Sequence, residues 1–247
     1  MSNNFKVVEI ARKTWAIVDL SRGNGVNTFL LEGDDCSLLI DSGYGINDIS
    51  IVCSSLTNKN VICVCTHGHI DHAMGARFFS ESYLHSNDFD VYRMNERIAG
   101  LDHHEIAPIN NIPKFELGSR VVTWKLFPGH TPGSIVFLDS LTHFLFDGDA
   151  EQPSQWLFMD ESSDIATYRA NLLDNIEWMK TAGVTYRFCG HSDPSSPLDT
   201  DLSDLVACTD KIIEQPESYS RHSIRLGAHK VPVKLYRYGN YSINYRI

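Results

Sequence analysis

Four polar side chains in residues 66–72 have the types and spacing of metal ligands. His67 and His69 are two residues apart, and Asp71 and His72 are adjacent. Residues two apart in an extended chain point to the same side, so the two histidines can bind one ion as a pair. The chain must then bend, which can direct Asp71 and His72 at a second ion a few ångströms away.

Three more candidate ligands follow apolar segments later in the chain. His130 lies in a turn rich in Gly and Pro, Asp149 follows the apolar residues 143–146, and His191 follows residues 186–189. Side chains at the ends of several strands meet at one rim of an α/β fold. We therefore expect all seven to converge, with His130 completing a three-histidine site and Asp149 able to bridge two cations.

Five histidines and two aspartates without a thiolate suit Zn²⁺, Fe or Mn rather than Ca²⁺ or Mg²⁺. Structural zinc sites are usually closed by cysteine, whereas sets of His and Asp tend to leave a position for water. Two metal ions about 3.5–4 Å apart can hold a hydroxide that is a nucleophile at neutral pH. The sequence thus predicts a catalytic centre with two Zn²⁺ ions, with Fe or Mn as alternatives.

Short strands and a crossover must position the first group of ligands. Apolar alternation predicts a meander of four strands, and a helix and a buried strand then lead into the histidine motif. The predicted strands are 6–10, 15–19, 27–32, 37–41, 61–65 and 83–85, the predicted helices are 47–56 and 71–79, and residues 87–113 are expected to be part helix and part loop.

The second half repeats strands that end near Gly, Asp or His. Its longest predicted helix has an amphipathic stripe, and a final hairpin is expected to turn at Gly239 and Asn240. The predicted strands are 120–127, 134–139, 143–146 and 186–189, the helices are 165–182 and 201–215, and the hairpin is 230–247. No linker divides the chain, so we expect one α/β domain over residues 1–247.

Charge and hydropathy exclude several classes of function. The 247 residues contain 21 Lys and Arg against 31 Asp and Glu, a formal net charge of −10. This charge opposes sequence-independent phosphate binding, so no nucleic-acid partner is expected. No apolar run reaches the ~18–20 residues of a membrane helix, and the N-terminus lacks a secretory signal. We expect a cytoplasmic protein with reduced cysteines and no membrane partner; its oligomeric state is open, although a cluster of tyrosines in the last hairpin favours packing on the core.

At these motifs the sequence resembles the metallo-β-lactamase-fold hydrolases over nearly its whole length. The family motif His-x-His-x-Asp-His is matched by His67, His69, Asp71 and His72, the Gly-His-Thr-Pro-Gly-Ser turn by residues 129–134, the bridging aspartate by Asp149 and the last histidine by His191. The resemblance implies a four-layer α/β/β/α sandwich of two mixed sheets with helices on the outer faces.

The resemblance also implies roles for the ligands. One metal would be bound by His67, His69 and His130, the other by Asp71, His72 and His191, and both by Asp149. Asp41 matches a position that orients a ligating histidine from behind. An Asp before Ser-Gly is also ordinary turn chemistry, so the alternative of a plain turn residue stays open for Asp41.

The remaining histidines lack a comparable context, and we interpret them as surface or loop residues: His85, His103, His104, His143, His222 and His229. His229 precedes the terminal hairpin and is kept as a candidate for the substrate pocket. Trp156, Phe158 and Met159, downstream of Asp149, can line an apolar pocket or pack beneath the next helix; the residue types allow both.

The predicted reaction is hydrolysis by a metal-bridging hydroxide, with Asp71 and Asp149 as the catalytic carboxylates. The missing signal peptide and the presence of Asp149 disfavour a β-lactamase, acidic charge disfavours a nuclease, and the segment after Asp149 lacks the glutathione-binding features of glyoxalase II. The leading hypothesis is a small-molecule hydrolase of esters, lactones or thioesters. A phosphodiesterase with a small substrate and a mononuclear-iron oxygenase of the same fold are the alternatives.

Overall fold

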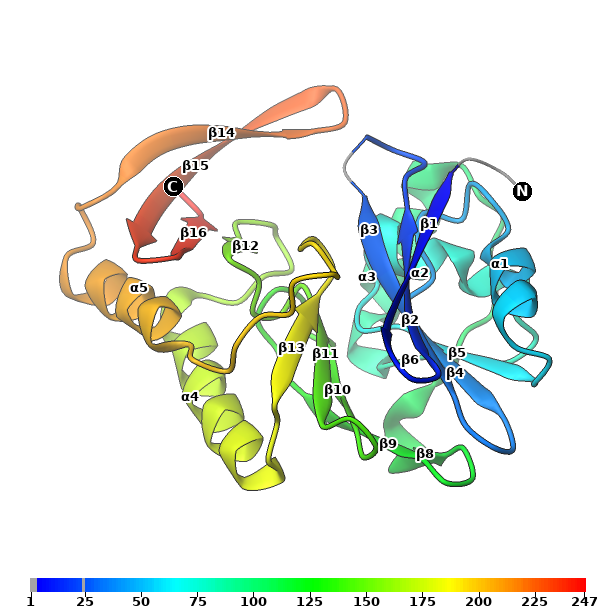
Figure 1. Ribbon diagram of the computed structural model, residues 1–247. Helices are drawn as coiled ribbons and strands as arrows, with labels where there is room; N and C mark the ends of the chain where they lie inside the picture. The colour runs from blue at the N-terminus through cyan, green and yellow to red at the C-terminus, as the bar shows by residue number, and fades with distance from the viewer. Residues whose placement is uncertain (1–3, 24) are drawn as a thin grey trace.

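A computed structural model describes residues 4–23 and 25–247, and its first sheet runs through the N-terminal half of the chain (Figure 1). The sheet is antiparallel from β1 to β4 and parallel from β4 to β7. In order across the sheet its strands are β1 (Phe5–Ala11), β2 (Thr14–Asp19), β3 (Val26–Glu32), β4 (Ser37–Ile40), β5 (Val61–Val64), β6 (Ser82–Leu84) and β7 (Ala107–Pro108). The predicted meander and crossover are confirmed.

The second sheet contributes the other inner layer. It has the order β13 (Tyr186–Cys189), β11 (Phe144–Gly148), β10 (Ile135–Asp139), β9 (Val121–Leu126) and β8 (Lys114–Glu116), with β11 and β13 parallel and the other pairs antiparallel. Apolar side chains of both sheets, among them Phe29, Phe137 and Phe146, form a shared buried cluster between them. This burial removes apolar surface from water and holds the two sheets face to face.

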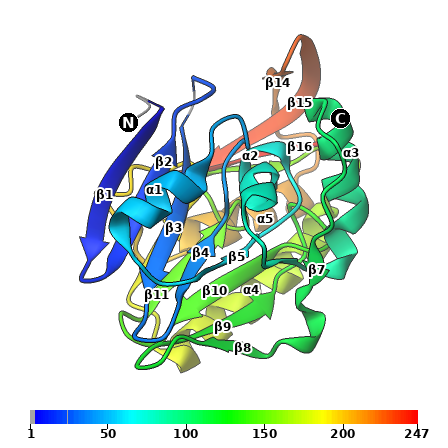
Figure 2. The ribbon, with the colours of Figure 1, turned by 90° about the vertical axis from the view of Figure 1, so that its right-hand side faces the viewer.

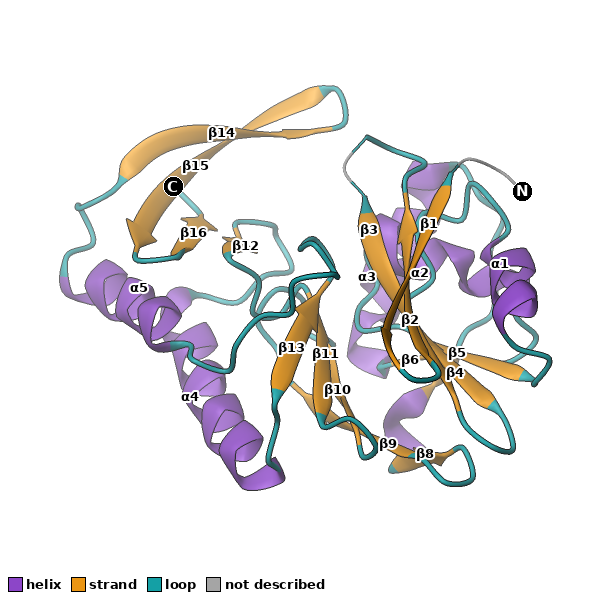
Figure 3. Cartoon of the chain, in the orientation of Figure 1, coloured by secondary structure: helices purple, strands orange, loops and turns teal. Residues whose placement is uncertain are grey.

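Helices cover the outer faces of both sheets (Figure 3). The first sheet is covered by α1 (Ile49–Leu56), α2 (Ile70–Ala73) and α3 (Phe89–Ala99), and the second by α4 (Ile165–Ala182), with α5 (Ser203–Glu214) packed against α4. Asp48 begins α1 by accepting a hydrogen bond from the Ser50 amide, and Asp164 caps α4 in the same way through Thr167. The predicted four-layer α/β/β/α sandwich is confirmed. That residues 1–247 form one domain stays a prediction.

The structure adds a third sheet that we did not predict. Its four strands have the order β12 (Ser154–Leu157), β16 (Tyr241–Tyr245), β15 (His229–Tyr238) and β14 (Ser220–Leu226), so the predicted final hairpin is one part of it. β14 escaped prediction because it is polar except at Ile224 and Leu226. The β14–β15 hairpin extends beyond the body of the molecule, as the two views in Figures 1 and 2 show.

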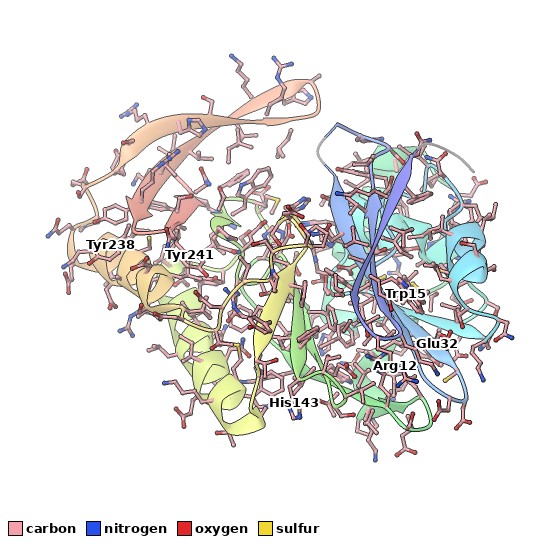
Figure 4. All side chains as sticks on the ribbon, viewed as in Figure 1. Arg12, Trp15, Glu32, His143, Tyr238 and Tyr241 are labelled. Carbon is pink, nitrogen blue, oxygen red and sulfur yellow. The ribbon has the colours of Figure 1, made fainter. Side chains whose placement is uncertain are left out.

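The third sheet is held together by its strand pairing and is attached to the rest of the chain by polar and apolar contacts. β12 pairs in parallel with β16, and the buried guanidinium of Arg187 in β13 donates a hydrogen bond of 2.7 Å to the Tyr241 hydroxyl. Tyr241 and Tyr245 are buried against α4 and α5, whereas Tyr238 is 46% exposed (Figure 4). The predicted packing of the tyrosine cluster on the core is thus confirmed for Tyr241 and Tyr245.

The structure divides two segments more finely than expected. The predicted helix 71–79 is α2 followed by a 3₁₀ helix, η1 (Met74–Phe78). Residues 87–113 contain α3, β7 and a 3₁₀ helix, η3 (Ile109–Asn111), after a further 3₁₀ helix, η2 (Ser86–Asp88). A Cβ on Gly75 would lie 2.1 Å from the Ser42 carbonyl oxygen, so the start of η1 packs directly on the chain after β4.

His85 is buried, contrary to its interpretation as a surface residue. Its ring lies 3.0 Å from the Asn110 amide and beside Trp124, and burial lowers the pKa of the imidazole below 6.5. The folded protein therefore binds a proton here less readily than the unfolded chain. The other histidines without a motif are exposed or half-buried, as predicted: His103, His104, His143, His222 and His229.

We expect the free energy of unfolding to fall as the pH is lowered below about 6.5, because protonation of His85 stabilises the unfolded chain. His85→Gln should make this decrease in unfolding free energy shallower. Above pH 7.5 the unfolding free energy of both proteins should depend less on pH than it does below pH 6.5. Urea denaturation at several pH values measures both slopes. Parallel wild-type and variant slopes below pH 6.5 would contradict the prediction, and the exposed His222→Gln is the control.

Candidate metal centre

The seven candidate ligands converge at one rim of the two inner sheets. His67 and His69 follow β5, Asp71 and His72 belong to α2, His130 precedes β10, and Asp149 and His191 follow β11 and β13. Three overlapping groups have potential ligand atoms within 4.8 Å of one another: His67, His69 and His130; His67, His72 and Asp149; and Asp71, His72 and His191. The structure therefore brings together every side chain that the sequence singled out as a ligand.

Asp149 lies between the two groups of histidines. One of its carboxylate oxygens is 3.4 Å from His72 Nε2, and the other is 3.6 Å from His130 Nε2 and 3.5 Å from His191 Nε2. On the first side, His69 Nδ1 and His130 Nε2 are only 2.9 Å apart. Two ring nitrogens directed at each other at this distance are the arrangement expected of two ligands of one cation.

Each of the five histidines presents one ring nitrogen to the centre and the other to the protein. The outward nitrogens contact the Thr66 hydroxyl (His67), the Glu161 carboxylate (His69), the Asp41 carboxylate (His72), the Trp156 carbonyl (His130) and the Gly25 carbonyl (His191). Such outer partners fix the ring orientation of metal-ligating histidines.

Several inward atoms have no hydrogen-bond partner within the described residues. His67 Nε2, His72 Nε2 and Asp149 Oδ1 are buried and form no hydrogen bond there, although the last two lie 3.4 Å from each other. A buried polar atom without a partner costs about 1–3 kcal/mol, so a cluster of three needs an occupant. Imidazole nitrogens and carboxylate oxygens together fit transition-metal ions such as Zn²⁺.

The pKa values of four candidate ligands suit a cation, whereas neighbouring carboxylates, Asp149 foremost, outweigh burial and raise the pKa of His72 and that of His191, the latter to about 11. Burial lowers the pKa of His67 well below its usual range and that of His130 to about 4, so both are neutral imidazoles at neutral pH. Burial raises the pKa of Asp71, but His72 and His191 outweigh it and lower the value to about 2. The pKa of Asp149 is also lowered, because His191 and His72 outweigh the effect of burial. Both aspartates are therefore ionised.

Asp41 supports the centre from behind. Its carboxylate accepts hydrogen bonds from the Thr66 amide at 2.7 Å and hydroxyl at 2.9 Å, and it lies 2.8 Å from His72 Nδ1. The residue has a φ of +61°, a conformation that costs a non-glycine residue about 1–3 kcal/mol and is often retained at functional sites. These contacts favour the orienting role over the plain turn.

Two glycines allow the loops of the centre to approach closely. Gly148 has a φ of +52°, and a Cβ there would lie 2.3 Å from the Thr66 hydroxyl. A Cβ on Gly190 would lie 2.6 Å from the His72 ring and 2.7 Å from Asp149. Only glycine fits these positions without displacing a candidate ligand.

Sequence reasoning missed Asp88, which joins the two main histidine loops. This buried carboxylate accepts hydrogen bonds from the Gly68 amide at 2.8 Å, the Gly133 amide at 2.6 Å and the Thr131 hydroxyl at 2.7 Å. One side chain thus holds the loop of His67 and His69 against the turn of His130. Nothing in the local sequence marks it, because its partners are far away in the chain.

Glu161 was also missed. Its carboxylate is 2.9 Å from His69 Nε2, the nitrogen that faces away from the centre. His69 accordingly directs Nδ1 inward, unlike the other candidate ligands of this group, His67 and His130. The sequence shows only a carboxylate in the loop that follows β12, and this signal is too weak to identify the role of Glu161 without the fold.

We expect Glu161→Gln to weaken metal binding by about 10- to 100-fold, because the amide is a poorer partner than a carboxylate for the outer N–H of His69. Chelator competition monitored by elemental analysis would measure the affinity. Glu177→Gln, on the exposed surface of α4, is the matched control. An affinity equal to that of the control would contradict a supporting role for Glu161.

The predicted pocket residues differ in their relation to the centre. The Trp156 carbonyl contacts His130, and Phe158 is buried in a small apolar cluster with Ile224 and Val233 of the β14–β15 hairpin. His229 lies exposed at the end of that hairpin, opposite Leu226. The packing of Phe158 thus involves the hairpin rather than the helix after it.

Fold and site together define a metal-dependent hydrolase with an α/β/β/α architecture. Residues 21–191 match the model of the metallo-beta-lactamase superfamily, and the chain belongs to this superfamily. Among the described residues, no helix combines the length and apolar character required to cross a bilayer.

Comparison with known proteins gives two kinds of similarity. The acyl-coenzyme A thioesterase MBLAC2 of Gallus gallus is 25% identical over 63% of this chain and 69% of its own, and MBLAC2 of Homo sapiens is 22% identical over 63% and 70%. A metallo-beta-lactamase from Pontibacter korlensis superposes with a TM-score of 0.66 at 16% identity, over 83% of this chain and 99% of its own. The structural similarity supports the fold.

Proposed function

We propose that this protein is a dinuclear hydrolase of acyl thioesters, with Zn²⁺ as the expected metal. The observation that carries the proposal is the convergence of seven ligand side chains around Asp149, with inward atoms unpaired and outward atoms held by the protein. The curated relatives named acyl-coenzyme A thioesterases favour a thioester over the other carbonyl substrates.

We assign one ion to His67, His69 and His130, a second to Asp71, His72 and His191, and both to Asp149. Metal ions bound there would polarise a carbonyl oxygen and make a water molecule nucleophilic at neutral pH. The protein's part is to keep His67 and His130 neutral and to hold every ring in a fixed orientation through its outer nitrogen.

Asp71 and Asp149 are the proposed catalytic carboxylates. Asp71 is ionised and its side chain is 20% exposed, so one carboxylate can both bind metal and accept a hydrogen bond from a water that enters the centre. Asp149 is more buried, at 8%, and suits the bridging role. A thiolate is a good leaving group, so thioester cleavage needs little further proton transfer from the protein.

The apolar surface of the acyl group has a place next to the centre. Trp156 is bonded to His130 through its carbonyl, and its ring lies 5.3 Å from that of Phe158, with Met159 packed on the same cluster. We propose that the partly exposed members of this cluster, Trp156 and Met159, contact the acyl chain, whereas the buried Phe158 supports them. His229 stays a weaker candidate for substrate contact.

The test combines metal content with a substrate panel. Elemental analysis would be made on the protein as purified, and the Zn²⁺-loaded protein would then be assayed with an acyl thioester, a lactone and an aryl phosphodiester. We expect two zinc ions per chain and highest kcat/KM for the thioester. Preference for the phosphodiester would select the phosphodiesterase alternative, and a single tightly held iron with oxygen consumption would select the oxygenase.

A further inference from the structure

Positive charge is concentrated in the last part of an otherwise acidic chain. No Asp or Glu follows Glu217, whereas six of the 21 Lys and Arg residues lie in residues 218–247. Most of this charge belongs to β14 and β15, the hairpin that projects from the third sheet and which we name the arm (residues 220–238) (Figure 1). A body with net negative charge thus carries a cationic arm.

The register of the arm places four cations on one face. Arg221 is directly opposite Lys234, and Arg225 is directly opposite Lys230. Residues alternate between the two faces of a strand, so the intervening Ile224 points to the other face and is buried there. Like charges in directly opposed positions destabilise a hairpin. A face built of two such pairs is therefore costly to the hairpin and suited to an anionic ligand.

These cations are not neutralised by the protein. Arg221, Arg225 and Lys230 are exposed, and within residues 4–23 and 25–247 none of the three forms an ion pair. Lys234 lies over the rings of Tyr219, at 4.7 Å, and Tyr245, at 5.9 Å, which position the ammonium group without cancelling its charge. Exposed guanidinium and ammonium groups in this state are suited to phosphate.

The opposite face of the arm connects it to the metal centre. Ile224 and Val233 pack on Phe158, and the adjoining Trp156 contacts His130. The apolar face therefore lies over the wall of the proposed acyl site, while the cationic face is turned outward. A ligand that passes the edge of this hairpin can place an apolar group on one side and anionic groups on the other.

We infer that the arm recognises the phosphate groups of a coenzyme A thioester. This inference rests on the proposed thioesterase function and adds the part of the substrate that is recognised. The two cation pairs are four residues apart, about 13 Å along a strand, so they can engage separate phosphate-bearing groups of one nucleotide. The acidic body repels the same phosphates, which orients the substrate with its nucleotide end on the arm.

The experiment compares one acyl group on two carriers. Coenzyme A carries phosphates and pantetheine carries none, so the full-length R225Q/K230Q variant would be assayed with acyl-coenzyme A and with the same acyl-pantetheine. We expect the ratio of kcat/KM for the two substrates to fall about tenfold, through a higher KM for acyl-coenzyme A. The preference of the wild type for acyl-coenzyme A should also weaken with added salt.

R97Q/K180Q is the matched control, because it removes one Arg and one Lys from exposed positions on α3 and α4. Calorimetric binding of coenzyme A itself gives a readout that is independent of turnover, and we expect it to weaken in the arm variant alone. Equal losses on both carriers, or unchanged coenzyme A binding, would overturn the inference. So would a variant that loses binding to phosphatidylserine vesicles but keeps its KM for acyl-coenzyme A.

Failure of the proposed function would look different. The unaltered protein would then hydrolyse neither acyl-coenzyme A nor acyl-pantetheine. If the unaltered protein hydrolyses both equally well, the thioesterase proposal stands and the arm has no role in recognition.

Discussion

Asp149→Asn is expected to lower the bound metal from two ions toward one per chain and to reduce kcat/KM for an acyl thioester by about 10³-fold. The carboxylate of Asp149 lies within 3.6 Å of His130 from one group of candidate ligands and of His72 and His191 from the other. An amide offers one weak oxygen ligand where the carboxylate offers two charged ones. Elemental analysis after gel filtration and steady-state kinetics measure the two effects.

Asp160→Asn is the matched control, because Asp160 is exposed in a nearby loop and contributes no candidate ligand atom. Far-ultraviolet circular dichroism would show whether both variants are folded. Two zinc ions per chain and near-normal turnover in Asp149→Asn would refute the bridging role and, with it, the dinuclear proposal.

The largest loss of stability is expected from Asp88→Ala, at about 3–5 kcal/mol of unfolding free energy. The substitution removes three hydrogen bonds and leaves the amides of Gly68 and Gly133 buried without a partner, at about 1–3 kcal/mol each. The loops of His67 and His130 should then separate. We therefore expect weaker metal binding as well, measured by urea denaturation and chelator competition.

Asp88→Asn should have a smaller effect, because the amide keeps one acceptor oxygen. Asp90→Ala changes an exposed carboxylate two residues away and serves as the control. If Asp88→Ala unfolds at the same urea concentration as Asp90→Ala, the buried carboxylate does not join the loops as described.

The sequence predicted the elements whose patterns are local. β2 and β3 are rich in buried apolar residues, and α4 begins and ends within a residue of its expected limits because Asp164 caps it and Gly183 ends it. The candidate ligands were found because each follows an apolar strand, and the structure brings all seven together, although their roles as ligands stay a prediction.

The features that the sequence did not predict depend on partners that are distant in the chain. Asp88 acts through Gly68 and Gly133, and Glu161 through His69, so neither has a signature in its own neighbourhood. β12 is short and is defined only by its pairing with β16. Asp41 was expected behind a histidine, but its left-handed backbone conformation became visible only in the fold.

The third sheet has a consequence for how such a protein can change. All seven candidate ligands lie on the first two sheets and their loops, whereas β14, β15 and β16 contribute none. The candidate metal centre and the proposed phosphate-binding face of the arm therefore lie on different sheets, which the Arg187–Tyr241 contact helps to join. Substitutions on the outward, cationic face of the arm can therefore alter the proposed recognition of substrate without touching a candidate ligand, whereas Ile224 and Val233 on its apolar face pack on Phe158. On this proposal, new substrates are accessible to the scaffold through one face of a single hairpin.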